Sequence, residues 1–249
     1  MRTPPAVYVS LAPFREWFRG GLPILMYHKL GPRPRRVKLK GLYVSARRFA
    51  RQLAELRAAG YRGATLDELP AALARPERRI VLTFDDAYVN VLVHGLPVLK
   101  QYGFPAIQYV VAEAIGGRND WDVRQGEAPE ALMDRAQLRE WLAAGQAIGS
   151  HGLSHVRLTQ VPPARAREEI FASKKKLEDL FGVPIRHFCY PYGDWNPAVR
   201  DWVIEAGYAS ACTTAFGIND SGASPFELKR IQARYPSFGL RELRRRLFG

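Results

Sequence analysis

The chain has 249 residues, 47% of them apolar, and a formal net charge of +13. This length allows one α/β barrel or two small domains with a sizeable core. No run reaches the ~18 apolar residues of a transmembrane helix, and the basic residues are not interleaved with stacking aromatics. We therefore expect neither a membrane span nor nucleic-acid binding.

The N-terminal residues and the cysteines bear on the compartment. Residues 1–5 lack the charged segment, apolar run and small-residue cleavage site of a secretory signal. The two cysteines, Cys189 and Cys212, both fall in strand-like segments, which favours buried free thiols over a disulfide. We expect a cytoplasmic location, provided that no leader has been trimmed from this sequence.

Short apolar runs alternate with helical periodicities through the first half of the chain. The strand expected at 79–86 contains a continuous apolar stretch at 80–82 and ends in two aspartates, and such a stretch is typical of parallel strands buried on both faces. A capping-box pattern at 65–68 opens a short helix. The other expected elements are strands at 23–28 and 106–111 and helices at 45–60 and 90–103.

The same alternation continues to the last strand. We expect helices at 138–144, 163–182 and 196–206, and strands at 147–150, 185–190, 208–214 and 227–232. Irregular loops are expected at 31–41, 116–129 and 216–225.

Seven or eight β units separated by helices predict a parallel sheet. Residues whose side chains suit catalysis or metal binding recur at the ends of different strands, where barrel active sites are assembled. We therefore favour a distorted (β/α) barrel of about seven parallel strands, with an open doubly wound sheet as the alternative. A single domain would fill residues 1–249, with its core at about 22–236.

The basic C-terminal segment allows two interpretations. Leu240, Leu243 and Leu247 have helical spacing, and arginines occupy other positions. The segment would form either a terminal helix with a solvated basic face or a helix in peripheral contact with an anionic membrane.

Two carboxylates and two imidazoles form the most informative pattern. Asp85 and Asp86 end the strand at 79–86, and neighbouring side chains on an extended segment point to opposite sides. His151 and His155 are four residues apart and can present both rings to one ion. Two imidazoles and one carboxylate form a facial ligand set for a divalent metal, and the remaining carboxylate is a candidate base for a metal-bound water. The pattern predicts a metallohydrolase.

Further candidates lie at the ends of two other strands. His28 ends the first strand and is either a general acid or a hydrogen-bonded core histidine. In the stretch 191–195, the Tyr192 main-chain amide can donate to an oxyanion, and Tyr192 and Trp195 can stack against sugar rings. An aromatic turn that covers the barrel end is the alternative.

Three motifs together resemble those of the NodB-type polysaccharide deacetylases, also called carbohydrate esterase family 4. They are Thr83-Phe84-Asp85-Asp86, the stretch from Ser150 to His155, and the stretch from Phe188 to Gly193. The resemblance spans roughly residues 22–236 and implies a distorted (β/α) barrel with one divalent ion, usually zinc. It also implies that Asp85 is the base, that Asp86, His151 and His155 are the metal ligands, and that the Tyr192 amide helps to form the oxyanion site.

Two departures from the family pattern point to other residues. Cys189 stands where the third motif has an arginine that positions the base, and Arg230 is the candidate replacement from another strand. No histidine follows His187, so the late motif that supplies the acid is absent. The chain is similar in this respect to the circularly permuted poly-N-acetylglucosamine deacetylases, which implies that His28 is the acid. We expect His28 to approach the metal site from the side opposite Asp85.

These observations predict a metal-dependent hydrolase that removes N-acetyl groups from N-acetylhexosamine residues of a polysaccharide. Pro191, Tyr192, Trp195 and Arg230 are the expected substrate-binding residues, and an N-acetylated glycan is the expected partner. A deacylase of a small glycolipid, sugar or formamide and a noncatalytic glycan-binding barrel are the alternatives.

Overall fold

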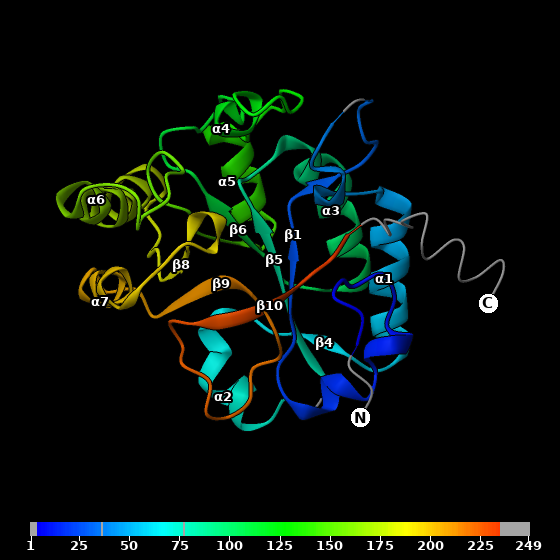
Figure 1. Cartoon of the computed structure of the whole chain (residues 1–249). Helices are drawn as coiled ribbons and strands as arrows, with labels where there is room; N and C mark the ends of the chain where they lie inside the picture. Colours follow the sequence, from blue (N-terminus) through cyan, green and yellow to red (C-terminus); the bar gives the residue numbers. More distant parts are fainter. Residues whose placement is uncertain (1–3, 36, 77, 235–249) are drawn as a thin grey trace, which may run out of the picture.

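Seven parallel strands close into a barrel in the computed structural model, which describes residues 4–35, 37–76 and 78–234 (Figure 1). Around the barrel the order is β1-β10-β9-β8-β7-β6-β5, and pairing of β1 with β5 closes the ring. The strands are β1 (Ile24–Tyr27), β5 (Arg79–Asp85), β6 (Ile107–Val110), β7 (Ala147–Ser150), β8 (His187–Cys189), β9 (Ser210–Phe216) and β10 (Leu228–Gln232). The predicted barrel is confirmed, and the open sheet is wrong.

The register shows how the first strand joins the two ends of the sheet. Leu25 of β1 lies opposite Leu82 of β5 on one side and Ile231 of β10 on the other. A short strand, β4 (Arg62–Gly63), pairs with β5 outside the ring. Strands β2 (Lys29–Leu30) and β3 (Tyr43–Val44) form a separate two-stranded sheet.

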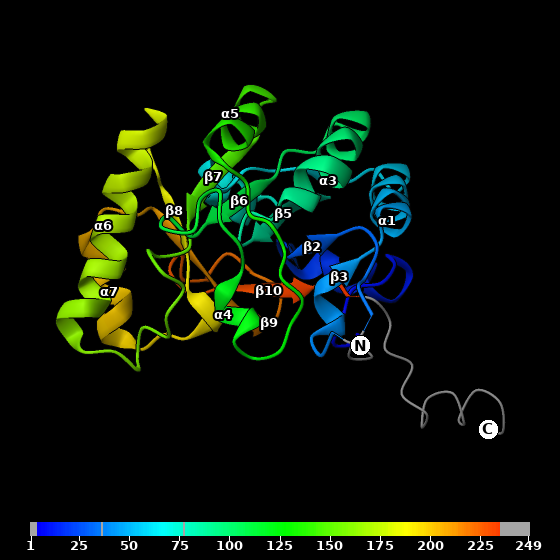
Figure 2. The ribbon, with the colours of Figure 1, turned by 90° about the horizontal axis from the view of Figure 1, so that it is seen from above.

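Helices cover the outside of the barrel, and Figure 2 shows α1, α3, α5 and α6 in an arc around the strands. Their starts and stops follow local chemistry: the Ser45 side chain accepts from the Arg48 amide at the start of α1, and left-handed Gly103 and Gly182 end α3 and α6. The helices are α1 (Ala46–Ala58), α2 (Leu69–Ala74), α3 (Val89–Tyr102), α4 (Asp120–Val123), α5 (Arg135–Ala143), α6 (Pro163–Phe181) and α7 (Pro197–Glu205).

The structure corrects the sequence prediction in three places. The expected loop at 116–129 contains helix α4, whose four residues are too few to show a helical period. Strand β9 continues to Phe216, beyond the predicted end at 214. Strand β5 ends at Asp85, because Asp86 and Ala87 have left-handed backbone angles, with φ of 74° and 58°. The two aspartates therefore do not share an extended segment.

The packed core begins before residue 22. Tyr8, Phe14 and Phe18 are buried in the main hydrophobic cluster, and the Tyr8 amide donates to the Gln232 carbonyl of β10. Cys189 and Cys212 are buried free thiols, as expected. No helix in the described ranges is long and apolar enough to cross a membrane. The basic segment with Leu240, Leu243 and Leu247 lies outside the described residues.

Candidate metal centre and active site

The predicted carboxylates and imidazoles meet at one end of the barrel. Asp85 is the last residue of β5, and His151 directly follows β7, so both lie where parallel strands end. The left-handed turn at Asp86 redirects its carboxylate away from the strand, and His155 also has a left-handed backbone, with φ of 61°. All four side chains are buried.

Asp86, His151 and His155 form a group that could hold a metal ion, and these three residues are called the metal group below. The Asp86 Oδ1 atom lies 3.6 Å from His151 Nε2 and 3.3 Å from His155 Nε2, and this buried oxygen has no hydrogen-bond partner. The His151 Nδ1 atom lies 2.7 Å from the Cys189 carbonyl, to which it can only donate, which leaves a lone pair on Nε2. An unpartnered carboxylate oxygen between two imidazole nitrogens fits a divalent ion.

The pKa values of these groups support the ligand-competent forms. Burial, followed by the nearby His155, lowers the pKa of His151 to about 4, so its ring is neutral at physiological pH. Burial opposes ionisation of Asp86, but the charge contributions of His155, His28 and His151 outweigh it and hold its pKa below the usual value. A neutral imidazole and an ionised carboxylate are the forms that bind a metal.

A second possible group, Asp85 with His151 and Cys189, is chemically less suited to a metal. Burial raises the pKa of the Cys189 thiol well above its ordinary value, so the thiolate that a metal requires is disfavoured. Asp85 is also already bound by an arginine. The geometry therefore favours Asp86 as the ligand carboxylate.

Arg230 of β10 binds Asp85 through both carboxylate oxygens. The Nη1–Oδ1 and Nη2–Oδ2 distances are 2.7 and 2.8 Å, and both residues are buried. The guanidinium also donates to the Thr213 carbonyl, Thr83 Oγ1 and Cys189 Sγ. Burial raises the pKa of Asp85, but Arg230 and then His28 outweigh this effect and lower it overall. The arginine thus fixes an ionised, oriented carboxylate beside the metal group.

His28 also reaches this cluster, but from a different direction than expected. It follows β1, the neighbour of β5, and its Nε2 atom lies 3.7 Å from Asp85 Oδ2. The expectation that it approaches from the side opposite Asp85 is therefore wrong. Because β1 and β5 are paired in parallel, their C-terminal ends place the two side chains next to each other.

Aromatic rings surround His155. Trp121 of α4 stacks on its imidazole at 4.4 Å between centroids, with 24° between the planes, and Tyr192 contacts it edge-on at 4.5 Å. The Arg157 guanidinium lies over the Tyr192 ring, 4.2 Å from its centroid. Sequence reasoning missed Trp121, which lies in the expected loop at 116–129. Its position within an Asp-Trp-Asp triplet in that loop was a signal, but no spacing tied it to the histidines.

A buried ion pair holds α4 next to the site. Lys29 of β2 is fully buried and its Nζ atom lies 3.5 Å from Asp122 Oδ2. The same oxygen accepts from the Tyr88 hydroxyl at 3.1 Å and the Asn119 amide at 3.2 Å. A buried lysine needs such a counter-charge. The pair therefore connects Trp121 to the strand that follows His28.

The remaining predicted residues lie in two environments. Pro191 and Tyr192 belong to the short helical turn after β8, and Tyr192 has a left-handed backbone, with φ of 61°. Trp195 stacks on Tyr190, with ring centroids 5.9 Å apart. The structure thus brings Tyr192 to the histidines and places Trp195 against the neighbouring core.

Comparison with known proteins gives consistent matches. The model of the family described as polysaccharide deacetylase matches residues 72–211. YxkH of Bacillus subtilis, whose name refers to the same family, is 26% identical over 215 residues, which are 85% of this chain and 71% of YxkH. The poly-β-1,6-N-acetyl-D-glucosamine N-deacetylase of Escherichia coli K12 is 27% identical over 142 residues. These cover 55% of this chain but only 20% of that enzyme.

Among solved structures, IcaB from Ammonifex degensii superposes with a TM-score of 0.74 and 26% identity. The match covers 90% of this chain and 95% of IcaB. The likeness therefore extends over nearly the whole of the barrel.

Proposed function

The chain belongs to the polysaccharide deacetylase family, and we propose that it is a metal-dependent hydrolase of N-acetyl groups on N-acetylhexosamine residues of a glycan. The observation that carries this proposal is the Asp86, His151 and His155 group beside an Asp85 that Arg230 holds through both oxygens. The E. coli relative named for poly-β-1,6-N-acetyl-D-glucosamine suggests a similar polymer as the substrate.

Asp86, His151 and His155 would hold one divalent ion, and zinc suits their mixture of imidazole and carboxylate donors. When bound, such an ion supplies a Lewis acid for the acetyl carbonyl and lowers the pKa of a water molecule. The carbonyl of Cys189 would keep the His151 tautomer in the ligating form.

The other residues of the cluster would handle protons and charge. Asp85, kept ionised by Arg230, would accept the proton of the attacking water. His28 would donate a proton to the departing amine, because an amide nitrogen leaves poorly without one. The Tyr192 main-chain amide would donate to the oxyanion, a contribution of the kind worth about 3–4 kcal/mol in other acyl-transfer sites.

A hollow beside Trp121, the residue that stacks on His155, supports a sugar substrate. Its volume is about 260 Å³, and its lining includes Trp121, Ser154 and Arg124. Trp121 contributes to both this hollow and the stack on His155. An aromatic ring with polar neighbours suits the apolar face and the hydroxyl groups of a sugar. A deacylase of small molecules would not need this extra room for substrate. A noncatalytic glycan-binding barrel would not need the ion pair between Asp85 and Arg230.

The proposal is tested with four substrates: acetate release is measured for poly-β-1,6-N-acetylglucosamine oligomers, chitin oligomers and monomeric N-acetylglucosamine, and formate release is measured for a formamide. We expect metal-dependent acetate release from an oligomer, faster than from the monomer, and release about 10²-fold slower or more with Asp85→Asn protein. Release from the monomer or formamide alone would support the small-molecule deacylase. Oligomer binding without acetate release from any substrate, with metal bound, would support the noncatalytic barrel.

A further inference from the structure

An arginine-lined cavity lies at the end of the barrel opposite the metal group. Strand β5 begins at Arg79 and ends at Asp85, so Arg78 and Asp86 flank its two ends. The cavity has a volume of about 380 Å³ and is lined by Arg15, Phe18, Arg19, Ala59, Tyr61 and Arg78. This hollow is therefore separate from the site of the proposed hydrolysis.

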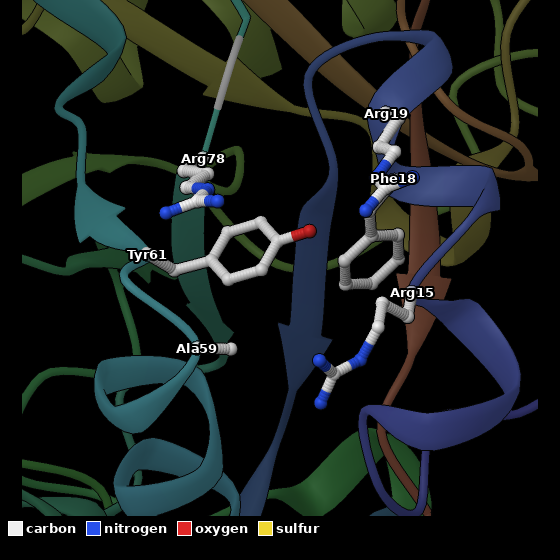
Figure 3. A pocket seen from close by; sticks show the side chains of 6 residues that line it. All are labelled: Arg15, Phe18, Arg19, Ala59, Tyr61 and Arg78. Atoms are coloured by element: carbon white, nitrogen blue, oxygen red, sulfur yellow. The ribbon is translucent and has the colours of Figure 1, made fainter.

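The walls combine positive charge with aromatic surface. Figure 3 shows Arg78 on one wall and Arg15 and Arg19 on the other, with the rings of Tyr61 and Phe18 between them. The two rings pack edge-to-face with centroids 6.0 Å apart, which fixes the floor of the hollow. The Tyr61 hydroxyl points across the cavity towards the opposite wall. The three arginines therefore converge from two separate segments around one polar hydroxyl.

Among the described residues, nearby carboxylates neutralise only one of these three arginines. Glu16 pairs with Arg19, and Glu55 pairs with Arg51, which is not part of the lining. Within the described ranges, Arg15 and Arg78 have no ion-pair partner. None of the described residues that line the cavity is acidic.

A second cavity extends the same positive surface. It has a volume of about 680 Å³ and shares Arg78 with the first. Its lining contains three further arginines, Arg62, Arg75 and Arg79, and one acid, Glu68. The Glu68 carboxylate is engaged by the amide and hydroxyl of Thr65. The excess of guanidinium groups therefore continues beyond the first hollow.

We propose that this arginine pocket binds a phosphate group carried by an organic molecule. Guanidinium groups match the geometry of phosphate oxygens and hold their charge at every physiological pH. Several arginines around one hollow suit a multiply charged phosphate better than a single carboxylate. Phe18 and Tyr61 would contact the apolar part of the ligand, and the Tyr61 hydroxyl would donate to a phosphate oxygen. The phosphate would come from a soluble phosphate ester or from a lipid headgroup.

The test compares Arg15→Gln/Arg78→Gln protein with the full-length parent chain. Glutamine removes the charge and keeps most of the side-chain length. The control is Lys100→Gln/Arg139→Gln, which removes the same charge from exposed positions on α3 and α5. Binding of pyrophosphate and glycerol 3-phosphate is measured by calorimetry at low and at physiological salt. We expect the pocket variant to bind at least tenfold more weakly than both other proteins, which is about 1.4 kcal/mol or more.

Vesicles distinguish the two sources of phosphate. Sedimentation is compared for vesicles with and without phosphatidylglycerol. If pyrophosphate and glycerol 3-phosphate bind weakly and vesicle binding requires Arg15 and Arg78, the ligand is a lipid headgroup. If the two soluble phosphates bind and the vesicles do not, the ligand is a soluble phosphate ester. Equal losses in the pocket and control variants would show an unspecific charge effect and overturn the proposal. So would the absence of binding by the parent chain to every probe. Acetate release should be unchanged in both variants.

Discussion

At the scale of single residues, Asp85 and Asp86 are sequence neighbours in different environments. Arg230 occupies both oxygens of Asp85, whereas a buried oxygen of Asp86 faces two histidines without a hydrogen bond. Asp85→Asn should therefore keep the metal but lower kcat by about 10²-fold or more, because only the base is lost. Asp86→Asn should instead weaken metal binding, because a ligand is lost. Metal analysis with acetate release measures both effects, and the reverse pattern would exchange the two roles.

Arg230 makes a second prediction, on pH dependence. Burial raises the pKa of Asp85, and the guanidinium more than offsets this effect. In Arg230→Gln the pKa of Asp85 should rise, so the ionised base is lost at a higher pH when the solution is acidified. The acid limb of kcat/KM should therefore move to higher pH. Arg200→Gln, at a partly exposed arginine of α7 that pairs with Asp201, is the control, and an unmoved acid limb in folded Arg230→Gln protein would contradict the prediction.

His28 makes the third residue-scale prediction. If it protonates the leaving amine, His28→Ala should retain metal and glycan binding but lose most turnover of the amide. The loss should be much smaller on an activated aryl acetate, whose leaving group needs little acid assistance. Parallel kinetics on the two substrates measure the difference. Equal losses would indicate that His28 orients Asp85, whose oxygen lies 3.7 Å from its Nε2 atom.

The site residues that could be predicted lie close to their partners in the sequence, and those that could not be predicted lie far from theirs. Asp85 with Asp86, and His151 with His155, form short motifs whose ligand chemistry can be recognised from the sequence alone. Arg230 contacts Asp85 across 145 positions, and only the resemblance to a family with an arginine at the Cys189 position suggested it. The direction of His28 depended on the pairing of β1 with β5, which no local pattern specifies.

At the scale of elements, α4 shows why a loop residue can matter to the metal group. The helix has four residues and was expected to be irregular, because so short a segment shows no apolar period. Its position depends on tertiary contacts, above all the buried Lys29–Asp122 pair. Regular helices such as α1, α3 and α6 were predictable because capping residues, terminal glycines and apolar spacing all occur within each segment.

The stack of Trp121 on His155 predicts a role for α4 in metal affinity. The His155 Nδ1 atom is buried and has no hydrogen-bond partner, so ring packing rather than a hydrogen bond orients this imidazole. Trp121→Ala should lower metal affinity by about tenfold, as the loss of other outer contacts to metal ligands does. Trp202→Ala on α7 is the matched control. Competition with a chromogenic chelator measures the affinity, and unchanged affinity in Trp121→Ala would show that the ring only borders the substrate hollow.

At the scale of the whole molecule, the strand count and the recurrence of site residues at strand ends predicted the barrel. The closing contact could not be predicted, since β1 pairs with strands that lie far from it in sequence. The contribution of the N-terminal segment was also missed. Tyr8, Phe14 and Phe18 enter the core from a bridge and short 3₁₀ turns, whose spacing matches neither a helix nor a strand.

Metal binding should be visible in the stability of the whole barrel. The Asp86, His151 and His155 group is assembled from β5 and β7 and their following turns, so the unfolded chain lacks it. A ligand that binds only the folded state at 100 times its Kd stabilises by about 2.7 kcal/mol. For a chain of this size that is a rise in Tm of roughly 5–10 °C on adding zinc to chelator-treated protein. His151→Ala/His155→Ala should show no rise, and His94→Ala, at a histidine on α3, should respond like the parent chain. A similar rise in the double variant would place the stabilising ion elsewhere and remove the metal assignment.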